Sequence, residues 1–487
     1  MTVMNAVAWC GIMFLLAAIL RAVIKPLGRM VIPSAIIGGI IGCILMNTCG
    51  LWRVTGADFS PISTHMYTFL FINMGLTAKL PKKEGETKLY AGGIKGMRQR
   101  MGDSQVSGIV GMGAMFAVLY AVQVLLAMGI IEVLGKGAGM DPIYGAALGF
   151  GFAQGPGQAA NFGAVMENYG WEHYVQVGIF FAAVGFVVSY IFGVPFARKG
   201  MRNGIAVSKT KMSESLMRGF YEPEEQESYG KLTTYGGNLD TMTFHIALVG
   251  LSWMGGHIIG NIWTWVGELV GSKTLSSTIA GMLFFNGMIA AYIIRAIVYK
   301  LGLDRYLDRG TQTRITNAAT DLMVMSTFLS LNLATVSKWM LPMLVVCVAG
   351  ALVTWLLMRY FGARFGGRND FERTLAEFGT ATGTNATGLS LVRIVDPNNE
   401  TTTAAELGPS NAVNLPACLI IVPTIFSAGA GAVSKGSLAV TMALIAVTHL
   451  AFMWIVGCWT KKTYSMSKGE KYRDGKCYQR NGEPVNE

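Results

Sequence analysis

Long apolar blocks separated by short polar segments run through almost the whole chain. At least ten of these blocks hold roughly 17–26 residues with no Lys, Arg or Glu. An apolar block of about 20 residues spans a bilayer as a helix, so we predict an all-α polytopic membrane protein. The eleven predicted spans are 3–20, 31–47, 62–78, 106–131, 173–197, 241–266, 275–294, 316–336, 339–358, 411–433 and 436–459.

Two further apolar segments, 143–165 and 376–395, are rich in Gly, Thr and Asn. The first contains GFAQGPGQAANFG, in which three glycines and a proline between Gly151 and Gly157 break any regular helix. Irregular backbone survives at membrane depth only when it is buried in protein or lines a polar cavity. We therefore predict two re-entrant hairpins, each of which enters the membrane and returns on the same side.

The distribution of basic residues supports this topology. With the N-terminus outside and neither hairpin crossing, 33 of the 39 Lys and Arg lie on the cytoplasmic side and five lie outside, as the positive-inside rule requires. Counting either hairpin as a full crossing would reverse every later segment and destroy this bias. The prediction is a multi-pass protein of the cell inner (cytoplasmic) membrane with a cytoplasmic C-terminus.

Five spans and one hairpin in each half make the second half run inverted relative to the first. The predicted parts are the N-terminal repeat 1–197, the cytoplasmic linker 198–239, the inverted repeat 240–435, an extra helix 436–459 and a basic tail 460–487.

Weak internal similarity agrees with an inverted repeat. Residues 34–39 resemble 276–281, residues 69–73 resemble 328–332, and the Gly151 to Gly155 spacing recurs from Gly379 to Gly383. None of the three similarities is specific by itself, and the evidence for a repeat is that they occur in the same order in both halves.

Tips of two hairpins that enter from opposite faces can meet near the midplane and form one site. Freed carbonyls with Asn and Thr oxygens suit a cation, and exposed helix N-termini suit an anion. No catalytic residue is predicted. The predicted substrate-binding residues are Gln154, Gly155, Gly157, Gln158, Asn161, Thr384, Asn385, Thr387 and Arg393. The predicted sodium-binding residues are Asn73, Gly151, Asn332, Asp321, Gly379, Thr380, Thr382 and Gly383, with no transition metal.

Several of these residues have a structural alternative. The glycines also fit close helix packing, and Asn73 and Asn332 fit hydrogen bonding between helices. Asp321, which the predicted topology puts in the first turn of span 316–336, fits either ion coupling or helix capping. Arg393 fits either a substrate carboxylate or a basic position at the cytoplasmic interface.

Composition excludes other classes of protein. Only 14% of the residues are charged, against about 25% in soluble domains. The net charge of +11 does not indicate nucleic-acid binding, because the basic residues flank apolar blocks. The seven scattered cysteines show no CxxC, and there is no HExxH, GxSxG or Walker A sequence, which argues against a metal site, an enzyme and ATP-driven transport.

Four motifs together resemble the sodium/glutamate symporter family of bacteria, over about residues 6–433. These motifs are IPSAIIGG, FLFINMGLTAKL, GxGxxxGPGQA and FGTATGTNATGLSLVRIVDP. The resemblance implies two repeats with ten core helices, a homodimer, and sodium-driven accumulation of an amino-acid anion by an elevator-like movement of one domain. It carries site roles over to Gly155, Gly157, Gln158, Gly379, Gly383, Thr384 and Thr387.

The chain departs from the family pattern in three places, one of which is its long linker 198–239. Its first hairpin tip reads Gln154-Gly-Pro-Gly157 where many members have a Gly-Gly-His-Gly type tip, and an eleventh span follows the core. The expected function is sodium-coupled symport of glutamate or a similar small carboxylated solute. The alternatives are symport of another carboxylate, proton coupling through Asp321, a membrane-embedded enzyme, and a channel, which would not need two inverted broken hairpins.

Overall fold

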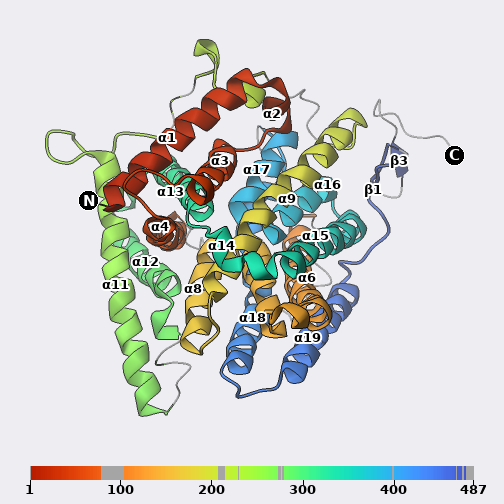
Figure 1. Cartoon of the computed structure of the whole chain (residues 1–487). Helices are drawn as coiled ribbons and strands as arrows, with labels where there is room; N and C mark the ends of the chain where they lie inside the picture. The colour runs from red at the N-terminus through yellow and green to blue at the C-terminus, as the bar shows by residue number, and fades with distance from the viewer. Residues whose placement is uncertain are drawn as a thin grey trace. The chain divides into compact units, whose positions relative to one another are not determined.

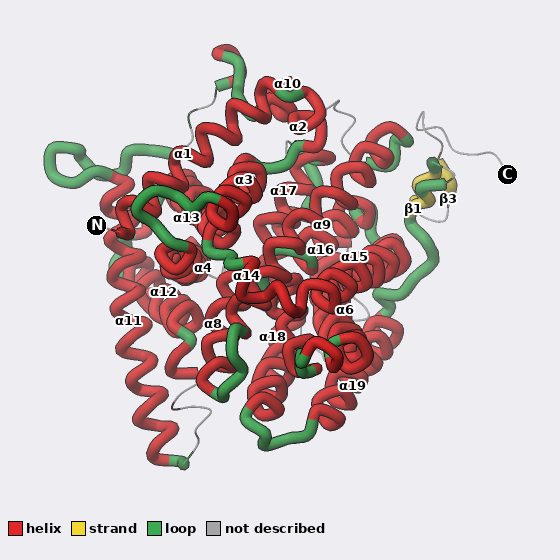
Figure 2. The backbone as a smooth tube through the Cα atoms, in the orientation of Figure 1, coloured by secondary structure: helices red, strands yellow, loops and turns green. Residues whose placement is uncertain are grey.

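The computed structural model describes residues 2–77, 104–206, 214–226, 228, 230–271, 276, 279–397, 400–467, 469–473 and 476–478. The described chain is helical apart from a small antiparallel sheet near the C-terminus (Figure 1, Figure 2). The predictions for the loop 79–104, for part of the linker 198–239 and for the end of the basic tail fall largely outside these residues.

The chain forms two compact units, each assembled from separate stretches of sequence. The first unit contains residues 1–17, 34–86 and 221–331. Its elements are α1 (Thr2–Val23, of which the end belongs to the second unit), α3 (Ser34–Thr48), α4 (Gly56–Thr77), η4 (Pro223–Glu225), α11 (Thr241–Leu269), α12 (Leu283–Lys300), η6 (Asp304–Tyr306) and α13 (Arg309–Leu329).

Small residues allow the helices of the first unit to pack closely. A Cβ atom on Gly256 of α11 would lie 2.7 Å from the backbone nitrogen of Gly287 in α12. Across α4 and α13, the buried hydroxyls of Ser63 and Thr327 are 2.8 Å apart. Close approach and buried polar contacts are the usual means by which membrane helices associate, since lipid leaves no hydrophobic gain for their contact.

The second unit contains residues 18–33, 87–220 and 332–487. Its first elements are α2 (Lys25–Met30), α6 (Ser104–Leu134), η1 (Lys136–Ala138), η2 (Pro142–Gly145), α7 (Ala146–Leu148), η3 (Gly149–Ala153), α8 (Pro156–Asn168), α9 (Tyr174–Arg202) and α10 (Glu214–Arg218). Then follow α14 (Leu333–Val336), η7 (Ser337–Trp339), α15 (Met340–Phe361), η8 (Gly362–Arg364), α16 (Asp370–Ala381), α17 (Asn385–Val395), α18 (Thr403–Gly429), α19 (Lys435–Val456), β1 (Tyr464–Ser465), β2 (Glu470–Arg473) and β3 (Lys476–Tyr478). The strands pair in the order β1-β2-β3.

Helix α6 is the central helix of the second unit. It packs against α15, α16, α18 and α19, and a Cβ atom on its Gly113 would lie 2.4 Å from the carbonyl oxygen of Ser410 in α18. An apolar helix that is enclosed on most sides is a core helix rather than a lipid-facing one. The two broken segments pack against this rigid centre.

The chain is a multi-pass membrane protein. Eight helical stretches in the described residues are long and apolar enough to cross a bilayer: Val3–Val23, Gln105–Leu134, Tyr174–Arg202, Thr241–Leu269, Leu283–Lys300, Leu333–Arg364, Thr403–Gly429 and Lys435–Val456. Each of the eleven predicted spans overlaps a helix, but α3 is only 15 residues long and α4 and α13 are not among the eight.

One predicted boundary is wrong in a way that changes the assignment of a residue. Helix α13 begins at Arg309 rather than near residue 316, because Asp308 caps it and accepts a hydrogen bond from the backbone N–H of Thr311. Asp321 therefore lies in the middle of α13 and not in its first turn. The capping alternative for Asp321 is wrong, since Asp308 is the cap.

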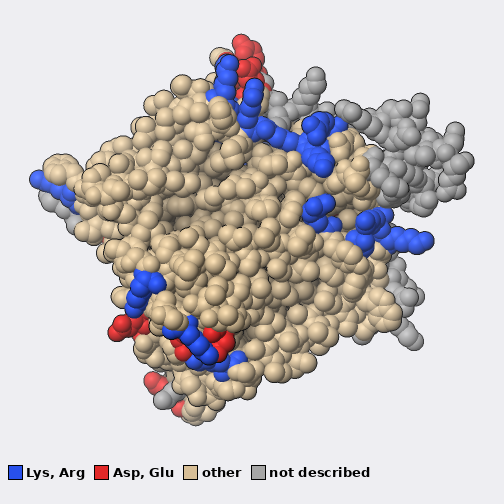
Figure 3. Space-filling model, turned by 45° about the vertical axis from the view of Figure 1, so that its right-hand side comes forward, with Lys and Arg blue, Asp and Glu red and all other residues tan. Residues whose placement is uncertain are grey.

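The surface carries large areas without charge. On the face drawn in Figure 3, most atoms belong to residues other than Lys, Arg, Asp and Glu. Along α19, Val440, Leu444 and Val447 are all exposed, and their spacing puts them on one side of the helix. An exposed apolar stripe of this kind suits contact with lipid.

Candidate functional site

The first broken segment folds back on itself at Gly155. After the π-helical turn η3, Gly155 has φ +82°, which favours glycine, and Pro156 then begins α8. The rings of Phe150 and Phe162 lie 4.9 Å apart although the two residues are twelve positions apart in the sequence, whereas a straight helix would put them about 18 Å apart. The two arms therefore lie side by side.

The second broken segment consists of α16 and α17, with the break at Thr382, Gly383 and Thr384. A Cβ atom on Gly379 would lie 2.8 Å from Cα of Gly388, so the two arms are in backbone contact. Thr384 caps α17 and accepts a hydrogen bond from the backbone N–H of Thr387 at 3.4 Å.

The two breaks meet within the second unit. A Cβ atom on Gly155 would lie 2.6 Å from Cγ2 of Thr384 and 3.0 Å from the carbonyl oxygen of Gly383. The contact joins the positions at which α8 and α17 begin. The two helix breaks are therefore in contact.

Two helices begin at this point, and helix N-termini are chemically suited to an anion. The first-turn N–H groups of a helix lack helical partners and carry a partial positive charge, which suits a carboxylate. Gln158, in the first turn of α8, is only 6% exposed, and its Oε1 has no hydrogen-bond partner among the described residues. Asn385, the first residue of α17, is half-buried.

Helices α6 and α9 hold the end of α16 in place. Gln123 of α6 donates to the carbonyl of Ala381 at 2.8 Å and to the hydroxyl of Thr354 at 3.0 Å. The hydroxyls of Ser189 in α9 and Thr382 are 2.6 Å apart. Neither Gln123 nor Ser189 is predicted from the sequence, although a lone Gln within an apolar block is an available signal.

The other predicted residues of the two segments have varied surroundings. Gly157 and Thr387 are buried close to the breaks, whereas Asn161 is half-buried further along α8 and Arg393 is exposed on α17. The side-chain nitrogen of Gln154 lies 3.6 Å from the sulfur of Cys418 in α18.

Three predicted sodium-binding residues make local contacts. Thr380 donates to the carbonyl of Ala376, and Thr382 donates to that of Phe378. A Cβ atom on Gly151 would lie 2.7 Å from the backbone nitrogen of Ala182 in α9.

Three further predicted sodium-binding residues lie outside the two broken segments. Asn73 and Asp321 belong to the first unit, where Asn73 donates to the carbonyl of Gln312 at 2.7 Å and so joins α4 to α13. Asn332 follows the end of α13 and caps α14, accepting from the N–H of Thr335. Asn332 is thus not inside a span, because α13 already ends at Leu329.

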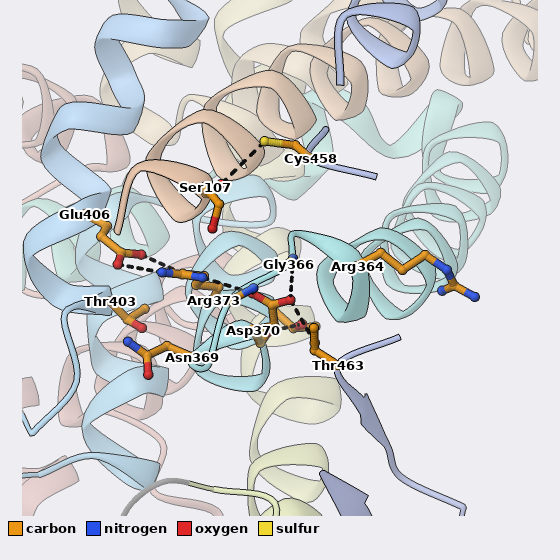
Figure 4. Close-up of polar contacts among 12 residues, drawn as sticks. Ser107, Arg364, Gly366, Asn369, Asp370, Arg373, Thr403, Glu406, Cys458 and Thr463 are labelled. Carbon is orange, nitrogen blue, oxygen red and sulfur yellow. Dashed lines mark hydrogen bonds and ion pairs between the residues drawn. The ribbon is translucent and has the colours of Figure 1, made fainter. Parts of the chain in front are cut away.

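A buried ion-pair network lies at the start of α16 (Figure 4). The guanidinium of Arg373 donates to both carboxylate oxygens of Glu406 at 2.7 Å and to Asp370 at 3.0 Å. Thr463, from the segment after α19, donates to Asp370 at 2.8 Å. Burial disfavours the charge of Arg373, but the hydrogen bonds and the attraction of Glu406 outweigh this and raise its pKa. From the sequence, Arg373 is only one of the 33 Lys and Arg on the predicted cytoplasmic side, and nothing there indicates this network.

Comparison with known proteins agrees with the motifs. Residues 1–376 match the family described as the sodium/glutamate symporter family. The match ends within α16, so the second break and FGTATGTNATGLSLVRIVDP lie outside it. No curated protein and no solved structure matches the chain. Since the family match covers well over half of the sequence, the chain belongs to the sodium/glutamate symporter family of membrane transporters and is not an enzyme.

Proposed function

We propose that the protein is a secondary transporter that couples the entry of sodium to the uptake of glutamate or a similar small carboxylated solute. The family is sodium-coupled, and Na+ is a co-substrate of its transport reaction rather than a bound cofactor. A sodium ion that moves inward gains about 2.3 kcal/mol per 100 mV of membrane potential, so one or two ions can drive useful accumulation.

The contact between Gly155 and the Gly383–Thr384 pair carries this proposal. At this contact two helix N-termini come together, and these suit the carboxylate of the solute. The adjoining break offers a backbone carbonyl and Thr hydroxyls as oxygen ligands for sodium. In the proposed site Gln158, Thr384 and Asn385 bind the solute, and Thr382 and Gly383 contribute to sodium binding.

An elevator-like cycle requires the two helix breaks to move together as parts of one domain. Both belong to the second unit, which supports movement of that unit as the carrier of solute and ion. The inverted repeats, the re-entrant course of the two segments, the external N-terminus and the homodimer remain part of the proposal.

Uptake by the purified protein in proteoliposomes tests the proposal. An inward sodium gradient should drive accumulation of labelled glutamate, and Gln158→Ala and Asn385→Ala should abolish it while the protein keeps its melting temperature. Asn168→Ala is the matched control, because Asn168 is exposed at the far end of α8. Uptake that follows a pH gradient and ignores sodium would contradict sodium coupling. Normal uptake by both site variants would contradict the site.

A further inference from the structure

An open pocket lies at the ends of two membrane-spanning stretches of the second unit. It is lined by Tyr360 and Arg364 from the end of the stretch Leu333–Arg364, by Trp454 from α19, and by Trp459, Thr460 and Lys461 from the segment that follows α19. Its volume of about 570 Å³ is within the range of about 300–1,000 Å³ that small-molecule sites have. None of these residues belongs to the two broken segments, so the pocket is separate from the proposed transport site.

Direct contacts fix the segment after α19 against η8, the turn that ends the first of these stretches. The carbonyl of Arg364 accepts from the backbone N–H of Thr460 at 2.9 Å and from its hydroxyl at 3.0 Å. The ring of Trp459 packs against that of Phe361, with the two centroids 4.8 Å apart. These contacts bring Lys461 to the same pocket as Arg364.

The pocket is basic. Among the described residues that line it, Arg364 and Lys461 are the charged ones, and both are cations. The guanidinium of Arg364 lies over the ring of Tyr360, 3.8 Å from its centroid, and Figure 4 shows it pointing away from Asp370. Within the part of the chain that the structure describes, neither cation forms an ion pair with a carboxylate. Their positive charge therefore suits an anionic ligand.

The carbonyl end of a helix, which disfavours an anion, is also at the pocket. Two of its carbonyls are already engaged, because that of Tyr360 accepts from the Arg364 side chain and that of Arg364 accepts from Thr460. A helix C-terminus carries a partial charge of about half a negative unit. The two full positive charges of the pocket exceed it, so the balance still favours an anion.

Exposed apolar stripes lead along both helices to this basic pocket. On α15, Leu352 and Leu356 are exposed, and the next position at the same spacing is Tyr360 in the pocket. On α19, the exposed Val447 is followed seven residues later, on the same side, by Trp454, which is 71% exposed. Such stripes suit the acyl chains of a lipid, and a water-soluble anion has no use for them.

We propose that this pocket binds the headgroup of an anionic phospholipid, whose acyl chains lie along the exposed sides of α15 and α19. Arg364 donates hydrogen bonds to the phosphate, which its planar guanidinium fits well, and Lys461 adds a second positive charge. Trp454 and Trp459 lie at the level of the headgroup, where aromatic side chains are enriched in membrane proteins. Basic pockets between transmembrane helices bind such headgroups. The site does not depend on the transported solute or the coupling ion, so it can stand if the proposed function fails.

Lipid binding to the purified full-length protein in detergent tests the proposal. Native mass spectrometry gives the dissociation constants of phosphatidylglycerol, which is anionic, and of phosphatidylcholine with the same acyl chains, which is zwitterionic. A basic residue near an anionic headgroup strengthens binding about fivefold. The double variant Arg364→Gln with Lys461→Gln should therefore raise the dissociation constant of phosphatidylglycerol about twentyfold, and that of phosphatidylcholine much less.

The matched control removes the same charge outside the pocket. Arg359 and Lys462 are exposed and close in sequence to the two pocket cations, but they do not line the pocket. The double variant Arg359→Gln with Lys462→Gln should leave the dissociation constant of phosphatidylglycerol close to its native value. An equal rise in both double variants, or equal binding of the two lipids by the native protein, would overturn the proposal, because general attraction to a basic surface would then explain the binding.

Two further measurements address folding and the source of the phosphate. The melting temperature without lipid shows whether a variant folds, and Lys461→Gln alone, at an exposed position, should still weaken phosphatidylglycerol binding about fivefold if the double variant does not. An unchanged constant in a folded variant would overturn the proposal. Inorganic phosphate and glycerol phosphate, which lack acyl chains, should not compete with phosphatidylglycerol at equal concentration. Competition by either would identify a site for a water-soluble phosphate compound and overturn the lipid assignment.

Discussion

Gly155 and Thr384 are in contact where two helix breaks, far apart in the sequence, meet. A Cβ atom on Gly155 would come within 2.6 Å of Cγ2 of Thr384, and Gly155 has φ +82°. Both the local backbone and the neighbouring segment therefore require glycine at this position. The contact links the start of α8 to the start of α17, the two positions at which we place the transported solute.

Gly155→Ala is expected to lower the initial rate of sodium-driven uptake about tenfold or more. The added methyl group would force the two breaks apart, and overpacking of this kind costs about 1–3 kcal/mol. Gly170→Ala is the control, because Gly170 has φ +91° but nothing within 4 Å of the added atom. The control shares the strain of the left-handed backbone and lacks the clash. Equal rates in the two variants would show that the contact has no part in transport.

Gly379→Ala tests the contact between the arms of the second broken segment. The added Cβ atom would meet backbone atoms of Gly388 at 2.8 and 2.9 Å, which cannot rotate away. We expect a loss of about 1–3 kcal/mol of stability, measured by thermal unfolding in detergent, together with reduced uptake. Gly408→Ala, at an exposed position in α18 with nothing within 4 Å, should be neutral or slightly stabilising, since alanine favours a helix by about 0.5–1 kcal/mol. Destabilisation of both variants to the same extent would contradict the packing argument.

Features of the fold that depend on neighbouring residues could be predicted from the sequence, whereas those that depend on other segments could not. Span-length helices such as α6 and α9 follow from local apolar composition, and the breaks after Ala153 and Ala381 follow from Gly, Pro and Thr content. The predicted span begins at residue 316 although α13 begins at Arg309, because Asp308 caps the helix in a polar segment that hydropathy assigns to a loop.

The residue pairs that touch between distant segments could not be predicted from the sequence. The predicted inverted repeat brings the two tips together, but only the packed chain shows that Gly155 and Thr384 are in contact. For the same reason the sequence does not indicate the ion pair of Arg373, since its partner Glu406 lies on another helix.

Arg373→Met is expected to destabilise the protein by about 3–5 kcal/mol, because it leaves the buried charges of Glu406 and Asp370 without their cation. The double variant Arg373→Met with Glu406→Leu removes the stranded charge of Glu406 and should recover part of this loss. Chemical or thermal unfolding of both variants and of Glu406→Leu alone completes a double-mutant cycle. A double variant that is less stable than Arg373→Met would contradict a charge-compensating role for the pair.

Asp308→Ala is expected to loosen the start of α13. Asp308 accepts hydrogen bonds from the backbone N–H and the hydroxyl of Thr311 at 2.7 and 2.9 Å, and loss of such a cap costs about 1 kcal/mol. Hydrogen–deuterium exchange of the first-turn amides should become about fivefold faster, which corresponds to that free energy. Asp304→Ala is the control, because Asp304 lies outside α13 and is exposed.

The effect of the Asp308 cap should depend on pH with a defined sign. Burial raises the pKa of Asp308, but the hydrogen bonds from Thr311 outweigh it, so the folded-state pKa is below the ordinary value of 3.8. A depressed carboxyl pKa contributes stability that is present above the unfolded-state pKa and is lost as the pH falls through the folded-state pKa. The native protein should therefore protect these amides better than Asp308→Ala at neutral pH, and the difference should shrink below pH 3.8. A difference that stays constant through this acid range would mean that the ionised carboxylate is not what stabilises the first turn of α13.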